Sequence, residues 1–382
     1  MKKIVLINQN SGYLMIDIAN ALSGRNLNTS LIAGRLVVRN KQLDDSVRVR
    51  KIIKYFRSNK MKRLFSWIIA FFEIIIIIKT KYRNDYLLII TNPPFTTFIP
   101  FLCPNRFSLM IFDVYPDAVT QTGLLAENSI LVRYWQKANK KVFPRADNIF
   151  TLSESMALRL REYCNTKKIK ITPIWSDNEF FKSIKKSLNP FVSEYNLSER
   201  FVVLYSGNLG STHNVEIIPE LASCTENPDV IFVIIGDGDR RNWLDEAIRK
   251  RELKNCLLLP LQAVDKIPYS FASADLAIVS LGTMASGLSL PSKTFNFMSA
   301  GLPLLCIAGI DSELYQLVTK YENGKCFIPD QIGEIVTFIQ EMSDNQELCA
   351  LYRANSLKAS RDFTPRNAEL IAEAICNSIE TN

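Results

Sequence analysis

The sequence is poor in the residue types that build metal centres and disulfide frameworks. Its 382 residues include one histidine, and the eight cysteines are scattered with no C-x-x-C pair. This pattern excludes a structural zinc site of the usual ligand spacing and argues against a disulfide framework. A reducing compartment, the cytoplasm, is therefore expected. Met1-Lys2-Lys3 leads directly into an apolar strand pattern, so we expect no secretory signal there.

The chain also lacks a fixed-period repeat, a low-complexity tract and an apolar run as long as a bilayer is thick. Its longest such run, Leu64 to Ile78, has fifteen residues and is apolar except for Ser66 and Glu73. A bilayer crossing needs about 20 residues. Basic residues flank the run on both sides. Three interpretations stay open: a buried helix, an interfacial helix on an anionic membrane, or a true membrane span.

Length and charge indicate two domains with different partners. A chain of 382 residues is too long for one ordinary hydrophobic core. Residues 1–190 carry 31 Lys and Arg against 13 Asp and Glu, a net charge of +18, whereas the remainder carries 15 against 25, a net charge of −10. The basic half is expected to face something anionic: nucleic acid, a phosphorylated substrate or a membrane surface.

The order of apolar runs predicts an α/β fold. Strand patterns near residues 3–8, 85–91, 108–112 and 147–152 alternate with helical patterns, and a second series of the same kind begins near residue 201. The runs are continuous rather than alternating, which is typical of parallel sheets covered on both faces. A polar segment without a clear period, residues 175–195, is the expected linker. The sequence therefore predicts two doubly wound domains, 1–180 and 195–362, and a last helix within 363–382.

Two glycine-bearing turns follow strands of the second series. The stretch YSGNLGSTHN contains Gly207, Asn208, Gly210 and His213, and VIIGDGDRR contains Gly236. A glycine turn before a helix is suited to phosphate, because the first N–H groups of the helix are unpaired. Either turn could also be an ordinary strand–helix connection, and a lone histidine is more often structural. Asp237 and Asp239 match a metal-binding D-x-D, but acidic residues are common in turns, so no metal is expected.

The stretch LPSKTFNFMSAGLPLLC predicts a helix from Pro291 to just before Gly301. Phe295 and Met298 are expected to pack inward, while Lys293 and Asn296 share another face at i and i+3. Ser292 begins the helix, and the small-residue loop before it contains Gly287 and Leu288. Such a loop lets a ligand lie against the backbone. A plain crossover helix with a solvated Lys293 is the alternative.

Three loops of the first series are expected on one rim, because ligands of open α/β sheets bind at the carboxyl ends of the strands. They contain Gly12, the stretch TNPPF (91–95) and the stretch FDVYPD (112–117). Asp113 could serve an acceptor hydroxyl as a catalytic group, and Asp117 is a second candidate. Surface turn carboxylates without a catalytic role are the commoner case.

Taken together, TNPPF, DVYPD, RADNIFTLSESM, YSGNLG, IGDGDRR and PSKTFNFMSAGLPLL resemble the GT-B-fold glycosyltransferases of family 4, and especially the bacterial members that build capsule and O-antigen polysaccharides. The resemblance covers most of the chain. It implies two Rossmann-like domains facing a central cleft. The N-terminal domain would bind the acceptor, often a polyprenyl-linked glycan at the membrane. The C-terminal domain would bind the nucleotide sugar, and the final helix would cross back onto the first domain.

The resemblance also implies site residues. The diphosphate of the donor would lie at Gly207, Ser292 and Lys293, with Lys293 as a catalytic group. The family has two glutamates eight positions apart, which would fall at Leu288 and Asn296. The second usually contacts the ribose, so an amide would take that role here. Family members retain the anomeric configuration and need no metal.

The resulting prediction is a retaining glycosyltransferase without a metal cofactor. Its donor would be a nucleotide-diphosphate sugar and its acceptor a lipid-linked glycan. It would be cytoplasmic and peripheral on the inner membrane. Two alternatives stay open: a non-catalytic partner subunit, which the missing glutamates would explain, and a nucleotide-sugar 2-epimerase, which would need more carboxylates and histidines. Nucleic-acid binding is not expected, because the basic residues lie among apolar runs.

Overall fold

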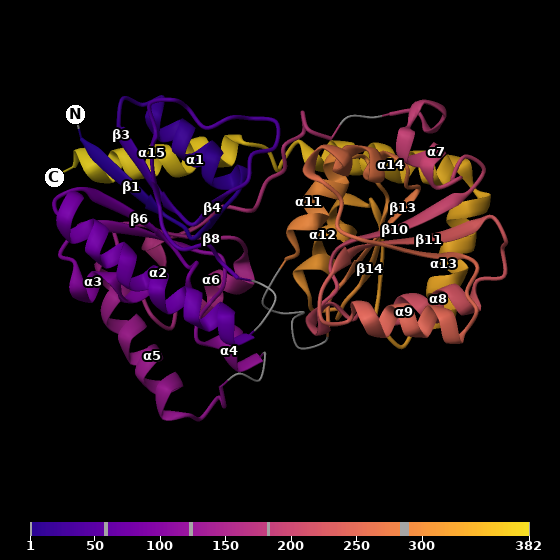
Figure 1. Cartoon of the computed structure of the whole chain (residues 1–382), viewed down its shortest axis with the longest axis horizontal. Coiled ribbons are helices and arrows are strands. Elements are labelled where there is room, and N and C mark those ends of the chain that lie inside the picture. Colours follow the sequence, from indigo (N-terminus) through magenta and orange to yellow (C-terminus); the bar gives the residue numbers. More distant parts are fainter. Residues whose placement is uncertain (1, 57–59, 122–124, 182–183, 283–289, 382) are drawn as a thin grey trace. The chain divides into compact units, whose positions relative to one another are not determined.

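The computed structural model describes residues 2–56, 60–121, 125–181, 184–282 and 290–381. The chain divides into two compact units. Unit 1 is Met1–Ile174 together with Pro365–Asn382, and unit 2 is Trp175–Thr364. The chain therefore passes between the units twice, at residues 174–175 and 364–365. Both units are α/β, with helices on both sides of a sheet (Figure 1).

Unit 1 contains a seven-stranded sheet in the order β5-β3-β1-β6-β7-β8-β9, and every strand pair is parallel. β6 and β7 are buried along their whole length, which is why they read as continuous apolar runs. A separate short pair, β2 (Asn10–Ser11) with β4 (Arg35–Leu36), follows the end of β1. The strands of the large sheet are β1 (Lys3–Ile7), β3 (Asn28–Ala33), β5 (Arg48–Lys51), β6 (Tyr86–Ile90), β7 (Phe107–Ile111), β8 (Ile149–Thr151) and β9 (Ile169–Ile171).

The helices of unit 1 include the C-terminal one. α15 packs against α1 although 342 residues separate the end of one from the start of the other, and Asn148 donates a hydrogen bond to Ser378 Oγ at 2.8 Å. The return of the last helix to the first domain, which the family resemblance implies, is thus present. The helices are α1 (Tyr13–Ser23), α2 (Lys60–Lys81), α3 (Ile99–Leu102), α4 (Asp117–Gln121), α5 (Ile130–Val142), α6 (Glu154–Leu160) and α15 (Arg366–Glu380).

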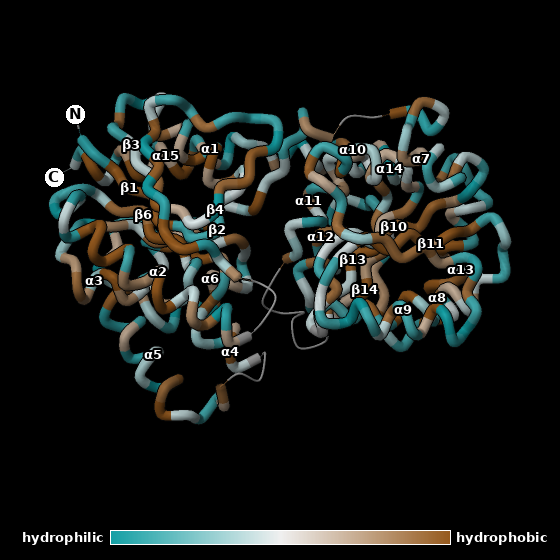
Figure 2. Tube along the Cα trace, in the orientation of Figure 1, coloured by the Kyte–Doolittle hydropathy of each residue, from teal (hydrophilic) through white to brown (hydrophobic). Residues whose placement is uncertain are grey.

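The apolar run of the first half lies in α2, which has two different faces. Ala70, Ile74 and Ile78 are buried at a spacing of four residues, so this face is part of the core. The opposite face is apolar as well but exposed; its members are Met61, Leu64, Phe65, Ile68, Phe72 and Ile76. Figure 2 shows hydrophobic residues along α2 in addition to those of the two sheets. No described helix combines the length and hydrophobicity that a bilayer crossing needs.

Unit 2 contains a six-stranded parallel sheet in the order β12-β11-β10-β13-β14-β15. The strands are β10 (Phe201–Asn208), β11 (Val230–Asp237), β12 (Cys256–Leu259), β13 (Leu276–Ser280), β14 (Leu304–Ile307) and β15 (Gly324–Phe327). The helices are α7 (Pro190–Glu194), α8 (Ile217–Cys224), α9 (Arg241–Lys250), α10 (Ile267–Ala272), α11 (Ser292–Ser299), α12 (Glu313–Tyr321), α13 (Ile332–Asp344) and α14 (Gln346–Ser360).

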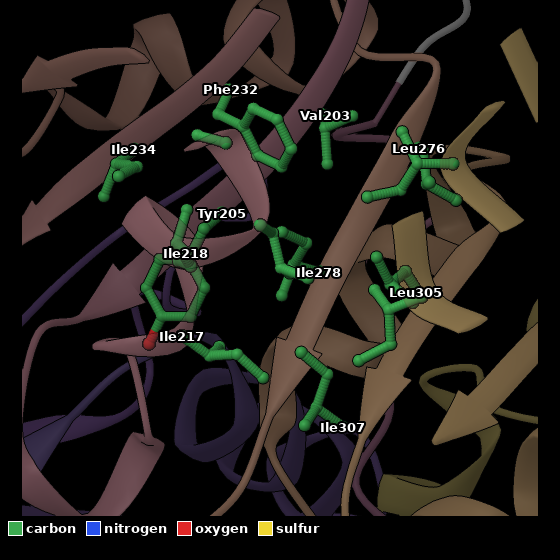
Figure 3. Packing of buried hydrophobic residues seen from close by; sticks show 14 of the residues in the cluster. Val203, Tyr205, Ile217, Ile218, Phe232, Ile234, Leu276, Ile278, Leu305 and Ile307 are labelled. Carbon is green, nitrogen blue, oxygen red and sulfur yellow. The ribbon is translucent and has the colours of Figure 1, made fainter. Parts of the chain in front are cut away.

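On one side of the unit 2 sheet, α8 and α13 pack against the strands and form a hydrophobic core. Tyr205, Phe232 and Ile278 project from neighbouring strands toward Ile218 of α8 (Figure 3). The described parts of the predicted linker, residues 175–181 and 184–195, also belong to this unit. Trp175 is fully buried there, and the ring of Phe181 stacks on Phe271 with centroids 5.1 Å apart. Because the segment is mostly polar, its sequence did not indicate that Trp175 and Phe181 are buried.

Candidate active site

The carboxyl ends of β10 and β11 meet as two bare glycines. Gly207 and Gly236 are register partners in the parallel pair. A Cβ atom on Gly236 would lie 2.1 Å from the carbonyl oxygen of Gly207, and Gly207 itself has a φ of +149°. Both conditions need glycine. The backbone at this edge of the sheet is therefore uncovered by side chains from these two positions.

The turn after β10 is held by hydrogen bonds and by Leu209, which is buried in the core of unit 2. The hydroxyl of Tyr205 donates to the carbonyl oxygen of Asn208 at 2.7 Å. Gly210 lies against the Asn208 side chain, and His213 ends the short turn Ser211–His213 that follows. The N–H of Gly282, after β13, donates to the carbonyl oxygen of Thr212 at 2.9 Å. The turn is thus joined to the next strand end of the sheet, and the sequence-predicted residues of this loop lie together.

α11 begins beside these strand ends and directs Lys293 at them. Lysines usually extend their ammonium to water, but here part of the stem is exposed while Nζ is buried. Nζ lies 3.7 Å from the ring centroid of Tyr205, and an ideal Cβ on Gly207 would be 3.5 Å from it. No hydrogen-bond partner for this atom is present among the described residues. A buried amine without a polar partner is costly, so this arrangement calls for an anion.

Burial lowers the pKa of Lys293 to about 7, and only the neighbouring Cys306 opposes the shift. None of the described carboxylates forms an ion pair with Lys293. The amine is therefore close to its titration point near neutral pH. An arriving anion would favour the ammonium form, because an opposite charge raises the pKa of an amine.

Asn296 has a different environment from the one predicted. Its side chain is 8% exposed, and Oδ1 accepts a hydrogen bond from Ser176 Oγ at 3.0 Å. The N–H of Ser176 donates to the carbonyl oxygen of Phe363 at 3.1 Å. Asn296 thus joins α11 to Ser176, and the backbone of Ser176 is joined in turn to the end of unit 2. The Oδ1 atom of the amide is used in this way, and the two N–H groups of Nδ2 have no described partner.

The rest of α11 packs as predicted. Phe295 and Met298 are both buried, and Gly301 with a φ of +70° follows the helix. Ser292 is exposed at the first position of α11, where the backbone N–H has no carbonyl to bind. Gly287 and Leu288, which were predicted to lie against the donor, are outside the described residues.

In the acidic turn at the end of β11, an aspartate side chain binds the backbone of the turn itself. Asp237 Oδ1 accepts from the N–H of Gly238 at 2.9 Å, which is the ordinary role of an aspartate in a turn. Arg240 forms an ion pair with Glu216 at 2.8 Å. Across the described residues, no three His, Cys, Asp or Glu side chains are grouped so that they could hold a metal ion.

In unit 1 the three predicted loops do share a rim. The N–H of Gln9, after β1, donates to the carbonyl oxygen of Asn92 at 2.8 Å, and the N–H of Phe112 donates to Thr91 Oγ1 at 3.0 Å. Gly12 caps α1 with open space around it. Asp113 is exposed after β7. The rim is formed. Desolvation by the surrounding residues raises the pKa of the Asp113 carboxyl, although a hydrogen bond with Tyr115 opposes the shift.

Two residues of the site could not be found by motif. Tyr205 forms the floor under Lys293, and its only signal was a tyrosine before the glycine turn. Ser176, the partner of Asn296, lies 120 residues away in a segment predicted to be a linker. A motif describes neighbours in sequence, whereas both contacts are made between distant segments.

Comparison with known proteins shows what this chain is similar to. Residues 191–359 match the family model "Glycosyl transferases group 1". The "Probable glycosyltransferase WbjE" of Pseudomonas aeruginosa is 22% identical over 309 residues, which are 77% of this chain and 76% of that protein. WcaI of Escherichia coli (strain K12), named for colanic acid biosynthesis, is 26% identical over 199 residues, 51% of this chain and 49% of its own length.

The solved structures agree with the fold. HepE of Anabaena, determined with UDP and glucose, superposes with a TM-score of 0.74 and covers 99% of this chain and 100% of its own, at 15% identity. Identity this low supports the fold alone. The fold expectation of two parallel-sheet, Rossmann-like units in a GT-B protein is confirmed.

Proposed function

We propose that this chain is a GT-B glycosyltransferase of glycan biosynthesis, whose residues 191–359 match the group 1 family model. It moves a sugar from a nucleotide-diphosphate sugar to a lipid-linked glycan with retention of configuration. The observation that carries the donor class is Lys293: a buried amine without a described hydrogen-bond partner beside two bare glycines. HepE, a structural neighbour, was determined with UDP. Neither a 2-epimerase nor a non-catalytic subunit is favoured by the relatives.

The proposed chemistry is stabilisation of a leaving group. As the glycosidic bond of the donor breaks, negative charge gathers on the diphosphate. The ammonium of Lys293 and the first N–H groups of α11 are placed to bind that charge, and positioned donors of this kind act most strongly where water is excluded. Gly207 and Gly236, at the carboxyl ends of β10 and β11, let the diphosphate approach the backbone. No metal ion is part of this proposal, and Asp113 is proposed to bind the acceptor hydroxyl.

The acceptor side of the proposal rests on unit 1. α2 exposes an apolar face, and the segment 48–83 around it carries eleven Lys and Arg against one carboxylate, Glu73. Ile53 donates its N–H to that carboxylate at 2.7 Å, so the basic strand β5 and its continuation run alongside the helix. An apolar stripe bordered by cations suits an anionic membrane surface, where a lipid-linked acceptor would lie. The protein is therefore proposed to be peripheral on the cytoplasmic face of the inner membrane.

We expect UDP or GDP to raise the melting temperature of the intact protein. A ligand that binds only the folded state at 100 times its Kd contributes about 2.7 kcal/mol to the free energy of unfolding. A thermal-shift series with both nucleoside diphosphates measures the effect. The matching nucleosides are the control, because they lack the diphosphate that Lys293 is proposed to hold. A series in which no nucleoside diphosphate shifts the transition more than its nucleoside would refute the donor class.

A second expectation concerns Asn296, whose Nδ2 we propose to contact the donor ribose. Asn296→Ala should raise the donor KM about 2- to 10-fold, the value of one hydrogen bond, and change kcat less. Steady-state kinetics at varied donor concentration measure the split. Acceptor KM should not change.

The variant Ser176→Ala separates two roles of Asn296. It removes the bond to Oδ1 and leaves Nδ2 in place. If Asn296 binds the ribose directly, Ser176→Ala keeps the donor KM of the wild type. Equal KM changes in both variants would mean that Asn296 acts only by holding residue 176, and an unchanged KM in folded Asn296→Ala would remove the ribose contact altogether.

A further inference from the structure

Unit 1 contains a cavity of about 120 Å³ that belongs to neither substrate site. Lys3, Arg48 and Arg50 line it from β1 and β5, and Lys81 lines it from the last residue of α2. Lys3 and Arg48 are the first residues of their strands, so the cavity lies at the amino edge of the sheet. The predicted acceptor loops lie at the carboxyl edge, about 16 Å away along a five-residue strand.

The four cations that line the cavity outnumber its acidic groups. Ion pairs elsewhere in the described part of unit 1 join Arg25 to Glu369 at 3.1 Å, Lys41 to Asp17 at 3.7 Å and Arg106 to Asp147 at 3.0 Å. Among the described residues, none of the four forms an ion pair. The one carboxylate of the lining is Asp85, which leaves three excess positive charges around the cavity.

Protection of a sheet edge does not explain this cluster. Exposed Arg and Lys on β5 are what an edge strand needs to avoid pairing with other chains. That account covers Arg48 and Arg50 only. Lys3 lies on β1 in the middle of the sheet and Lys81 at the end of α2. Cations from three elements therefore converge on one hollow at a cost in mutual repulsion.

The lining also holds one of its guanidinium groups in place. Arg50 Nε donates to the hydroxyl of Tyr82 at 3.3 Å, and Tyr82 is itself buried. The remaining N–H groups of Arg50 stay available. A guanidinium presents its N–H groups as a planar fork that matches phosphate oxygens, and a lysine adds a point charge. A cavity of 120 Å³ is also far larger than the roughly 10–15 Å³ that one water needs.

We propose that this cavity binds a phosphate group. Two sources have that chemistry: the headgroup of an anionic phospholipid, or a free phosphate compound. The headgroup fits the surroundings better, because Lys81 ends α2 and the exposed Ile76 precedes it by five residues, about 8 Å along the helix. Lys81 is also about 140° around the helix from Ile76, so its long side chain, and not the apolar face itself, would reach the phosphate of a lipid whose acyl chains meet that face. The site does not depend on the donor or on glycosyl transfer.

The test compares Arg48→Gln/Lys81→Gln with Arg161→Gln/Lys167→Gln. Both double variants remove two exposed positive charges from unit 1, but only the first changes the cavity. Inorganic phosphate binding is measured by titration calorimetry. Binding to phosphatidylglycerol–phosphatidylcholine vesicles, with pure phosphatidylcholine vesicles as reference, is measured by co-sedimentation. We expect the cavity variant to bind phosphate at least about tenfold more weakly than the control variant.

The vesicle arm identifies the source. A matching tenfold loss of binding to phosphatidylglycerol vesicles assigns the cavity to a lipid headgroup, whereas unchanged vesicle binding with weakened phosphate binding assigns it to a free phosphate compound. Equal phosphate binding and equal vesicle binding in both double variants would overturn the proposal. Lys3→Gln/Arg50→Gln is a second cavity variant in case the first does not fold. Transfer to a soluble acceptor should be unaffected in each, so failure here is separate from failure of the proposed function.

Discussion

Lys293→Met is expected to lower turnover by at least about 100-fold while leaving the protein folded. A single positioned donor that stabilises developing negative charge contributes roughly 100- to 1,000-fold to kcat. Lys293 Nζ lies 3.5 Å from where a Cβ of Gly207 would be, and it has no described hydrogen-bond partner. The guanidinium of Arg241, a second cation at this edge, already donates to the carbonyl oxygen of Gly236 at 2.8 Å. Methionine fills a similar volume over the Tyr205 ring but cannot bind a diphosphate. Initial rates at saturating donor and acceptor measure the loss.

The same substitution should make the ligand-free protein more stable, which separates lost chemistry from lost folding. The pKa of Lys293 falls from 10.5 to about 7 on folding, so between these values the unfolded chain binds more protons than the folded one. The stability of the wild type therefore rises with pH across this window, and the cost of the lysine is full below pH 7. The gain from Lys293→Met should be roughly 2 kcal/mol smaller at pH 9 than at pH 7.

Lys254→Met is the matched control, because Lys254 is an exposed lysine of unit 2 that does not belong to the candidate site. It should keep both turnover and the pH dependence of unfolding. Urea unfolding at the two pH values and the rate assay are made on all three proteins. Near-normal turnover in Lys293→Met would show that Lys293 does not take part in catalysis. A fall in stability at pH 7 would show that the amine is not buried without a partner in solution.

The fold could be predicted from the sequence because burial of parallel strands leaves a direct mark. β6 and β13 are buried along their whole length and read as uninterrupted apolar runs. The site was predicted less completely. Spacing placed Lys293 and Asn296 on one face of α11, but it does not determine which way a long side chain turns. Lys293 bends inward to Tyr205, and Asn296 binds Ser176.

The cavity at the amino edge of unit 1 had no sequence signal, for a related reason. Its cations come from residues 3, 48, 50 and 81. The parallel pairing of β1, β3 and β5 brings the first three together, and the end of α2 adds Lys81. The interpretation of the apolar run was incomplete rather than wrong. Composition alone allowed a buried helix, an interfacial helix or a membrane span, and α2 has one buried apolar face and one exposed apolar face. When a helix has apolar residues on both faces, its composition does not show which face is buried and which is exposed.

That exposed face of α2 carries the second prediction: Phe65→Ser/Phe72→Ser should weaken binding to anionic vesicles by about 100-fold. Phe65 and Phe72 are 66% and 58% exposed, and full burial of one such side chain contributes about 1.5–3 kcal/mol. Scaled by these exposed fractions, the two together contribute about 2–4 kcal/mol, and each 1.4 kcal/mol is tenfold in affinity. The folded protein should keep its stability, since neither ring belongs to the core.

Co-sedimentation with phosphatidylglycerol-containing vesicles at several salt concentrations measures this binding. The wild type should pellet with anionic vesicles and be released as salt rises, because its cations are screened. Leu188→Ser/Leu261→Ser, which removes two exposed leucines from unit 2, should pellet like the wild type. The double phenylalanine variant should stay in the supernatant even at low salt, since cations alone hold a surface weakly without apolar insertion. A wild-type protein that remains in the supernatant with anionic vesicles, or a variant that pellets equally well, would mean that α2 exposes its apolar face for some purpose other than the membrane.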